Sequence, residues 1–112
     1  MSNLHICADD TELRTNKSYM LLYFTASFCP PCKRIGPLIQ NYSDDPNYKH
    51  IDFFKVDIQD CPSIAESYDI KSVPTFILIS KQETSEIIQG KVVGANHENL
   101  QSLLSSTCKM YD

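Results

Sequence analysis

The 112-residue sequence contains no tryptophan and only three glycines, and it also lacks any long apolar run. No stretch approaches the roughly 18 apolar residues that a membrane-spanning helix needs, so we expect no membrane interaction. Residues 1–5 lack the basic segment, followed by an apolar core, that marks a secretory signal. These absences predict a reducing, cytoplasmic location, where structural disulfides are rare.

Positive charge is also scarce. Ten lysines and arginines stand against 14 aspartates and glutamates, which gives a formal net charge of -4, and the basic residues are scattered. Nucleic acids and anionic membranes are bound by clustered basic side chains, so neither is an expected partner. The length and a hydrophobic content of 42% predict one globular domain over residues 1–112.

Hydrophobic patterning predicts strands that alternate with helices. Such alternation indicates a parallel sheet, and two strands joined by the loop 80–85 add a hairpin, so the sheet is expected to be mixed. Pro37 is expected to kink the second helix without ending it. The predicted class is α/β, with a central five-stranded sheet flanked by four helices. Strands are expected over 4–7, 19–26, 51–57, 75–79 and 86–93, and helices over 10–16, after Cys29 to Asp44, from Pro62 and after Asn96.

Two cysteines, Cys29 and Cys32, stand where an apolar strand gives way to a helix. The unpaired N–H groups and partial positive charge of a helix N-terminus favour a thiolate at Cys29, and the thiolate is the nucleophile of disulfide exchange. Cys32 lies one helical turn later, within reach to close a disulfide or to resolve a mixed one. Pro30 and Pro31 suit the first turn because their missing N–H groups would have no partner there. The arrangement predicts a redox function.

A zinc site and a purely structural disulfide are the competing interpretations of this pair. Zinc normally needs a second pair of cysteines or histidines at compatible spacing, whereas Cys61 and Cys108 stand alone and the three histidines are dispersed. A structural disulfide would join residues that the helix already holds together. We therefore expect no metal site.

Several motifs together resemble the thioredoxin family over essentially the whole chain. They are FTASFCPPCK at 24–33, Pro37, KVD at 55–57, VPTF at 73–76 and VGA at 93–95. The resemblance implies the thioredoxin fold, with the dithiol exposed at one end of the sheet and a cis Pro74 facing it. It also implies that Val73 offers its backbone to an extended substrate. The docking patch that it implies comprises Phe28, Ile58, Val73, Pro74, Val93, Gly94 and Ala95.

The same resemblance implies a monomeric reductase of protein disulfides. Cys29 attacks a substrate disulfide, and Cys32 then resolves the mixed disulfide. No bound cofactor is expected; electrons are expected from NADPH through a thioredoxin reductase, so the partners are that reductase and disulfide-containing proteins. Two alternatives stay open: a glutathione- or tryparedoxin-type relative with a different electron donor, and a thioredoxin-fold binding subunit whose redox activity is incidental.

Some positions depart from the commonest family pattern. Pro30 replaces a glycine, as in tryparedoxins, which predicts a shifted redox potential. Tyr23 takes the place of a buried aspartate that assists proton transfer at Cys32. A phenol with a reference pKa of about 10 is a poor base at neutral pH, so we expect water, Lys55 or the departing sulfur to take that proton. Phe28 replaces one of the family's tryptophans and lacks its N–H donor.

Three cysteines lie outside the pair. Cys7 alternates inward in a strand and is predicted to be a small buried hydrophobe. Cys61 is a candidate regulatory thiol, although no second cysteine is near it in sequence. Cys108 is a candidate for linking two molecules under oxidation.

Overall fold

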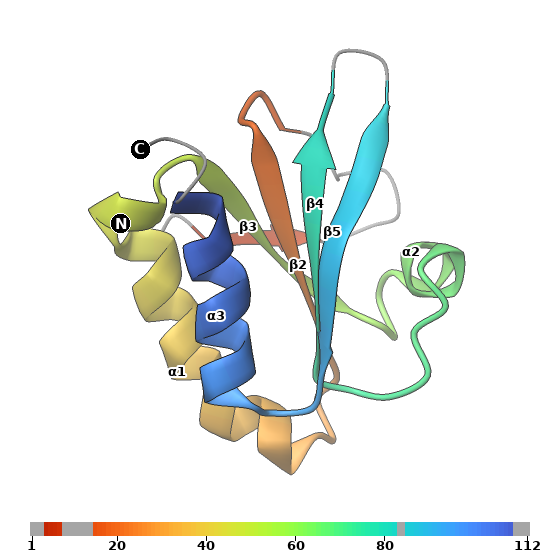
Figure 1. The fold of residues 1–112 in the computed structure, drawn as a ribbon. Coiled ribbons are helices and arrows are strands. Elements are labelled where there is room, and N and C mark those ends of the chain that lie inside the picture. The colour runs from red at the N-terminus through yellow and green to blue at the C-terminus, as the bar shows by residue number, and fades with distance from the viewer. Residues whose placement is uncertain (1–3, 8–14, 83–84, 109–112) are drawn as a thin grey trace.

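The computed structural model describes residues 4–7, 15–82 and 85–108. Figure 1 shows the elements in order. None of the helices in these ranges is long and apolar enough to cross a membrane. The elements are β1 (Leu4–Cys7), β2 (Tyr19–Thr25), α1 (Pro30–Asp44), the 3-10 helix η1 (Pro46–Tyr48), β3 (Ile51–Asp57), α2 (Pro62–Ser67), β4 (Thr75–Lys81), β5 (Glu86–Val93) and α3 (His97–Cys108).

The strands form one five-stranded sheet in the order β1-β3-β2-β4-β5. β3 pairs in parallel with both β1 and β2, whereas β4 pairs antiparallel with β2 and with β5. This arrangement confirms the predicted mixed sheet and the β4–β5 hairpin. β4 runs two residues further than predicted, to Lys81, because its polar end still pairs with the start of β5.

Apolar side chains pack on both faces of the sheet. Every residue of β2 is buried, as its apolar sequence predicted. Alternate residues point to opposite faces, so Leu21 and Tyr23 join the core beneath α1 and α3, while Leu22 and Phe24 join the core beneath α2. Figure 1 shows α1 and α3 together on one side of the sheet and α2 on the other.

The described residues contain three α-helices where four were predicted. The fourth was expected over 10–16, and residues 10–14 lie outside the described ranges. Thr15 and Asn16, which are described, are not helical. The hydroxyl of Thr15 instead donates a hydrogen bond to the carboxylate of Asp52.

α1 begins directly after Cys29 and places Pro30 and Pro31 in its first turn, as predicted. It continues through Pro37, and in Figure 1 its first turns, drawn in orange, run at an angle to the later yellow ones. The helix ends at Asp44. The helical start thus fixes where the cysteine pair stands relative to the sheet.

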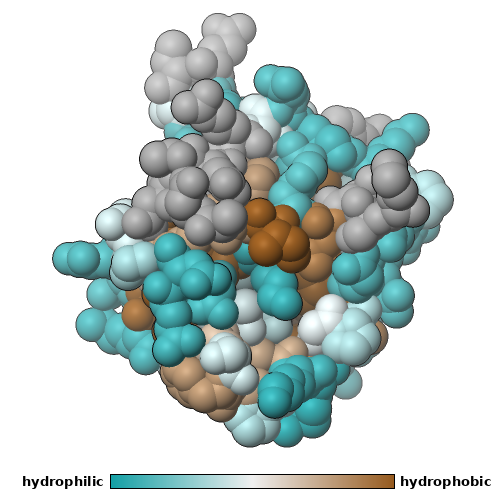
Figure 2. Space-filling view, turned by 180° about the vertical axis from the view of Figure 1, so that it is seen from behind, coloured by the Kyte–Doolittle hydropathy of each residue, from teal (hydrophilic) through white to brown (hydrophobic). Residues whose placement is uncertain are grey.

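α3 closes the fold over β5. The side-chain oxygen of Asn96 accepts a hydrogen bond from the backbone N–H of Asn99 at 2.9 Å, which confirms the predicted helix cap. A Cβ atom at Gly90 would lie 2.5 Å from the side chain of Leu103, so glycine allows α3 to approach the strand. Seen from behind (Figure 2), the surface is mostly hydrophilic and its apolar residues form separate patches.

Candidate active site

The two cysteines of the CPPC motif are joined as a disulfide at the N-terminus of α1, with their Cα atoms 5.2 Å apart. Cys29 is the N-cap residue, and its sulfur accepts a hydrogen bond from the backbone N–H of Cys32 at 3.2 Å. That N–H is one of the helix donors that would otherwise lack an intrahelical partner. The structure therefore confirms that one helical turn brings Cys32 within bonding reach of Cys29.

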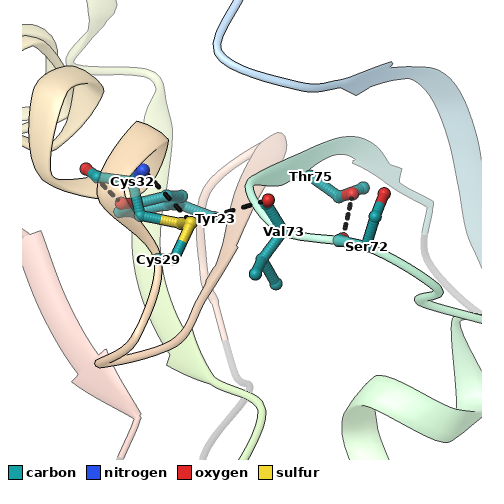
Figure 3. Close-up of a disulfide and its surroundings, with 6 residues drawn as sticks. All are labelled: Tyr23, Cys29, Cys32, Ser72, Val73 and Thr75. Carbon is teal, nitrogen blue, oxygen red and sulfur yellow. Dashed lines mark hydrogen bonds between the residues drawn. A yellow bond between two sulfur atoms is a disulfide. The ribbon is translucent and has the colours of Figure 1, made fainter.

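The Val73–Pro74 peptide bond is cis, as predicted, and lies directly opposite the disulfide (Figure 3). The carbonyl oxygen of Val73 is 3.5 Å from the sulfur of Cys29. The hydroxyl of Thr75 donates to the carbonyl oxygen of Ser72 at 2.7 Å, which closes the loop on itself. The fold thus brings the backbone of Val73 next to the sulfur of Cys29, 44 positions away in the sequence.

The disulfide is more covered than the resemblance implied. Cys29 is 4% exposed and Cys32 is 3% exposed, so the expectation of an exposed dithiol is wrong for this oxidised form. The reason is packing, since both cysteines belong to the core cluster beneath α1 and α3. Among the residues expected to form the docking patch, two large apolar side chains are exposed, namely Phe28 at 65% and Val93 at 58%.

The residues expected to form the docking patch meet at the same end of the sheet. The N–H of Gly94 donates to the carbonyl of Pro74 at 2.8 Å, and the N–H of Ile58 donates to the carbonyl of Thr25 at 3.0 Å. Gly94 has a φ of 94°, a conformation that side chains rarely adopt, so glycine allows this approach. We call Phe28, Ile58, Val73, Pro74, Val93, Gly94 and Ala95 the rim; Phe28, Val93 and Ala95 are exposed, Ile58, Val73 and Gly94 are half-buried, and Pro74 is buried.

Tyr23 reaches the cysteine pair from beneath. Its hydroxyl donates to the carbonyl oxygen of Cys32 at 3.0 Å (Figure 3), and its ring stacks on Phe76 with 5.1 Å between centroids. Burial raises the pKa of Tyr23 above its usual 10.0, although a hydrogen bond with Thr25 lowers it in part. Tyr23 is therefore a protonated donor at neutral pH.

Lys55 does not join this contact. It pairs with Tyr23 in the register of β2 and β3, but its residue is exposed, and no ion pair connects it to a described residue. The structure thus brings Tyr23 to Cys32 and leaves Lys55 at the surface.

Sequence reasoning missed one pair of cysteines. The sulfurs of Cys7 and Cys61 are 3.5 Å apart, although 54 positions separate the two residues. Cys7 ends β1, and Cys61 follows β3, the parallel neighbour of β1. The available signal was therefore that Cys7 lies at, and Cys61 shortly after, the carboxyl ends of adjacent parallel strands. In the described ranges, no group of three or more His, Cys, Asp and Glu side chains is placed to hold a metal ion.

Comparison with known proteins places this geometry in a family. The thioredoxin family model matches residues 7–106. Thioredoxin H4 of Arabidopsis thaliana is 37% identical over 93 residues, which cover 83% of this chain and 73% of the relative. A crystal structure of a Malassezia sympodialis thioredoxin superposes with a TM-score of 0.81 at 26% identity, over 96% of this chain and 93% of the other.

Thioredoxin-2 of Pyricularia oryzae is 34% identical over 104 residues, or 93% of this chain. This chain spans only 57% of that relative's length. The match nevertheless includes the cysteine pair and the strands that position it. The chain therefore belongs to the thioredoxin family of thiol–disulfide oxidoreductases.

Proposed function

We propose that this protein reduces disulfides in other proteins, with Cys29 as the nucleophile and Cys32 as the resolving thiol. The observation that carries the proposal is the placement of the Cys29 sulfur between a helix N–H donor, that of Cys32 at 3.2 Å, and the Val73 carbonyl at 3.5 Å. The N–H donor stabilises a thiolate, and the adjacent backbone can align a substrate segment with the sulfur.

In the reduced protein, the Cys29 thiolate attacks one sulfur of the substrate disulfide. The substrate's S–S bond breaks, a mixed disulfide forms, and the first substrate thiolate leaves. Cys32 then loses its proton and attacks the Cys29 sulfur. The mixed disulfide breaks, the second substrate thiolate leaves, and the Cys29–Cys32 disulfide forms. Two electrons pass to the substrate, and an external reductant must return them.

The proton on Cys32 goes to the departing substrate thiolate, directly or through water. Tyr23 is unsuited to accept it because burial raises its pKa and its hydroxyl already donates to the Cys32 carbonyl. Lys55 is exposed, so we assign it no direct part. A thiolate that leaves beside Cys32 is a stronger base than the protonated hydroxyl of Tyr23.

The rim supplies the binding surface for the substrate. Apolar contact comes from exposed Phe28, which precedes Cys29, and from exposed Val93, which pairs with Thr75 next to the cis proline. The half-buried Val73 offers its backbone to an extended segment, in the manner of strand addition. Substrates are therefore proteins whose disulfide lies in an extended, partly apolar segment.

The electron source in this proposal is NADPH, through a thioredoxin reductase, and the protein itself binds no cofactor. The working unit is a monomer formed by one domain over residues 1–112. A cytoplasmic location belongs to the same proposal, because the cycle requires a compartment that keeps dithiols reduced.

Reduction of insulin disulfides with alternative electron donors tests the proposal. We expect turnover with NADPH and a thioredoxin reductase, and none for Cys29→Ser. Turnover only with glutathione, NADPH and glutathione reductase would contradict the electron source. If insulin is reduced with none of these donors, the alternative of a thioredoxin-fold binding subunit is supported and the proposed function is contradicted.

A further inference from the structure

Cys7 and Cys61 form a second sulfur pair that the reductase cycle does not use. Their sulfurs are 3.5 Å apart, and the thiol of Cys61 also lies 3.3 Å from the carbonyl oxygen of Cys7, to which it donates. Both residues are buried, with 2% exposure at Cys7 and none at Cys61. The two thiols are therefore held against one another inside the protein.

The sheet separates the two sulfur pairs. Cys7 and Cys61 pack with Leu22 and Phe24 in the core beneath α2, whereas Cys29 and Cys32 belong to the core beneath α1 and α3. Residues of β2 that face one core cannot face the other. The catalytic disulfide of one molecule therefore has no direct path to the second pair of the same molecule.

We propose that Cys7 and Cys61 are a second redox pair, which closes as an intramolecular disulfide when the protein meets hydrogen peroxide. A disulfide requires about 2.05 Å between sulfurs, so the observed gap must close by roughly 1.5 Å. Rotation about the Cα–Cβ bond of a cysteine can move its sulfur by more than this distance. Both thiols are buried, so the oxidant must be small and uncharged to reach them.

The chemistry balances with peroxide as the only oxidant. One thiol loses its proton, and its sulfur attacks a peroxide oxygen; the O–O bond breaks, a sulfenic acid forms, and the released hydroxide takes the proton as water. The second thiol attacks the sulfenic sulfur. The S–O bond breaks as the S–S bond forms, and a second water leaves. Two thiols are oxidised by two electrons, and one peroxide is reduced.

The second disulfide would fasten an edge of the sheet to the segment that carries a rim residue. Among the described strands, β1 lies at an edge of the sheet and pairs with β3. Cys61 ends a turn in which its N–H donates a hydrogen bond to the carbonyl oxygen of Asp57 at 2.9 Å. Within that turn, the N–H of the rim residue Ile58 donates a hydrogen bond to the carbonyl oxygen of Thr25. The new disulfide would therefore tie β1 to this turn, and its formation uses neither Cys29 nor Cys32.

A variant that retains only this pair gives the direct test. Cys29→Ser, Cys32→Ser and Cys108→Ser together leave Cys7 and Cys61 as the only thiols. We expect peroxide to lower its intact mass by about 2 Da and to protect both cysteines from alkylation after unfolding, with dithiothreitol reversing both effects. A peptide that joins Cys7 to Cys61 should appear in the digest.

The matched control adds Cys7→Ser to this variant. Cys61 should then stop at a sulfenic acid that dimedone traps, with no loss of about 2 Da. Full alkylation after peroxide in the two-thiol variant, separate sulfinic acids that add about 32 Da each, or a cross-link between two molecules would each overturn the proposal. Circular dichroism checks that the variants fold. The peptide that joins Cys7 to Cys61 should also appear in a digest of the natural chain after peroxide treatment. Since the two-thiol variant lacks the catalytic cysteines, its result is independent of the insulin assay.

Discussion

The hydroxyl of Tyr23 donates a hydrogen bond of 3.0 Å to the backbone carbonyl of Cys32. The contact joins the middle of the central strand to the first turn of the catalytic helix. It uses a neutral phenol where the family's common pattern has a carboxyl group. We therefore infer that Tyr23 positions Cys32 and does not act as the base that deprotonates it.

Replacing Tyr23 with phenylalanine tests the positioning role. The ring can keep its stacking on Phe76, but the hydrogen bond to Cys32 is lost. We expect the free energy of unfolding to fall by about 1 kcal/mol, as measured by urea titration. Insulin turnover should stay within about twofold, because no proton transfer is removed. A tenfold loss of turnover with unchanged stability would show that the hydroxyl takes part in the chemistry.

The converse substitution, Tyr23→Asp, introduces a carboxyl group, and Tyr23→Asn is its uncharged match. If a base near Cys32 limits the resolving step, the mixed disulfide should decay faster in Tyr23→Asp than in Tyr23→Asn. Quenched-flow measurement of the mixed disulfide compares them. Equal decay rates would show that proton removal from Cys32 does not limit the resolving step.

Pro30 is predicted to tune the redox potential of the cysteine pair. It lies between the two cysteines and carries no N–H that a sulfur can use. Pro30→Gly restores a donor and backbone freedom, so the equilibrium with a glutathione buffer should move. Pro62→Gly is a matched control, since Pro62 also begins a helix but lies outside the pair. Equal potentials for the natural chain and Pro30→Gly would contradict the prediction.

The exposed valine of the rim should contribute to substrate binding. Val93→Ala removes apolar surface beside the disulfide, and we expect KM for insulin to rise by about fivefold at unchanged kcat. Ile88→Ala is the matched control, because Ile88 is on the same strand, is 56% exposed, and pairs with Ile79 away from the disulfide. A similar rise in KM for both variants would argue against a localised docking surface.

Asp52 should make the stability depend on acid pH. Burial alone raises its pKa, but hydrogen bonds from Thr15 and Lys17 outweigh that effect, together with the charges of Lys17 and His5. The folded pKa therefore lies below the ordinary 3.8. Since the unfolded chain binds the proton more readily, this stabilisation is present above pH 3.8 and is lost as pH falls through the folded pKa.

The corresponding variant is Asp52→Asn. We expect it to unfold more easily than the natural chain by about 1–2 kcal/mol at pH 6, because charged hydrogen bonds are lost. That difference should shrink as the pH falls below 3.8. Urea titrations at pH 6 and at a pH below 3.8 measure this difference in the free energy of unfolding. The control variant is Asp60→Asn, which removes a carboxylate at an exposed position. A difference that is independent of pH would contradict the ionic origin of the effect.

Much of the fold could be predicted from the sequence because its signals are local. The apolar run at 19–26 predicted a strand buried on both faces, and the structure buries all of β2. The polar end of β4 was missed because its pairing with β5, and not its hydropathy, extends the strand. Asn96 was predicted as a cap because that interaction spans only three residues.

The cysteine motif could also be predicted, since it consists of adjacent residues, and the cis Pro74 was predicted from the resemblance to the thioredoxin family. Three features of the structure could not be predicted in this way. The cover over Cys29, the bond from Tyr23 to Cys32, and the approach of Cys7 to Cys61 all depend on how separate elements pack. Sequence spacing carries no information about such contacts until the strand order is known.

The central claim is that Cys29 attacks the substrate and Cys32 resolves the product, and trapping measures this division directly. Cys32→Ser should accumulate a mixed disulfide with a disulfide-containing protein substrate, visible as a reducible band whose joined peptide contains Cys29. Cys29→Ser should accumulate none under the same conditions. A mixed disulfide that forms through Cys32 in Cys29→Ser, with none in Cys32→Ser, would contradict the account.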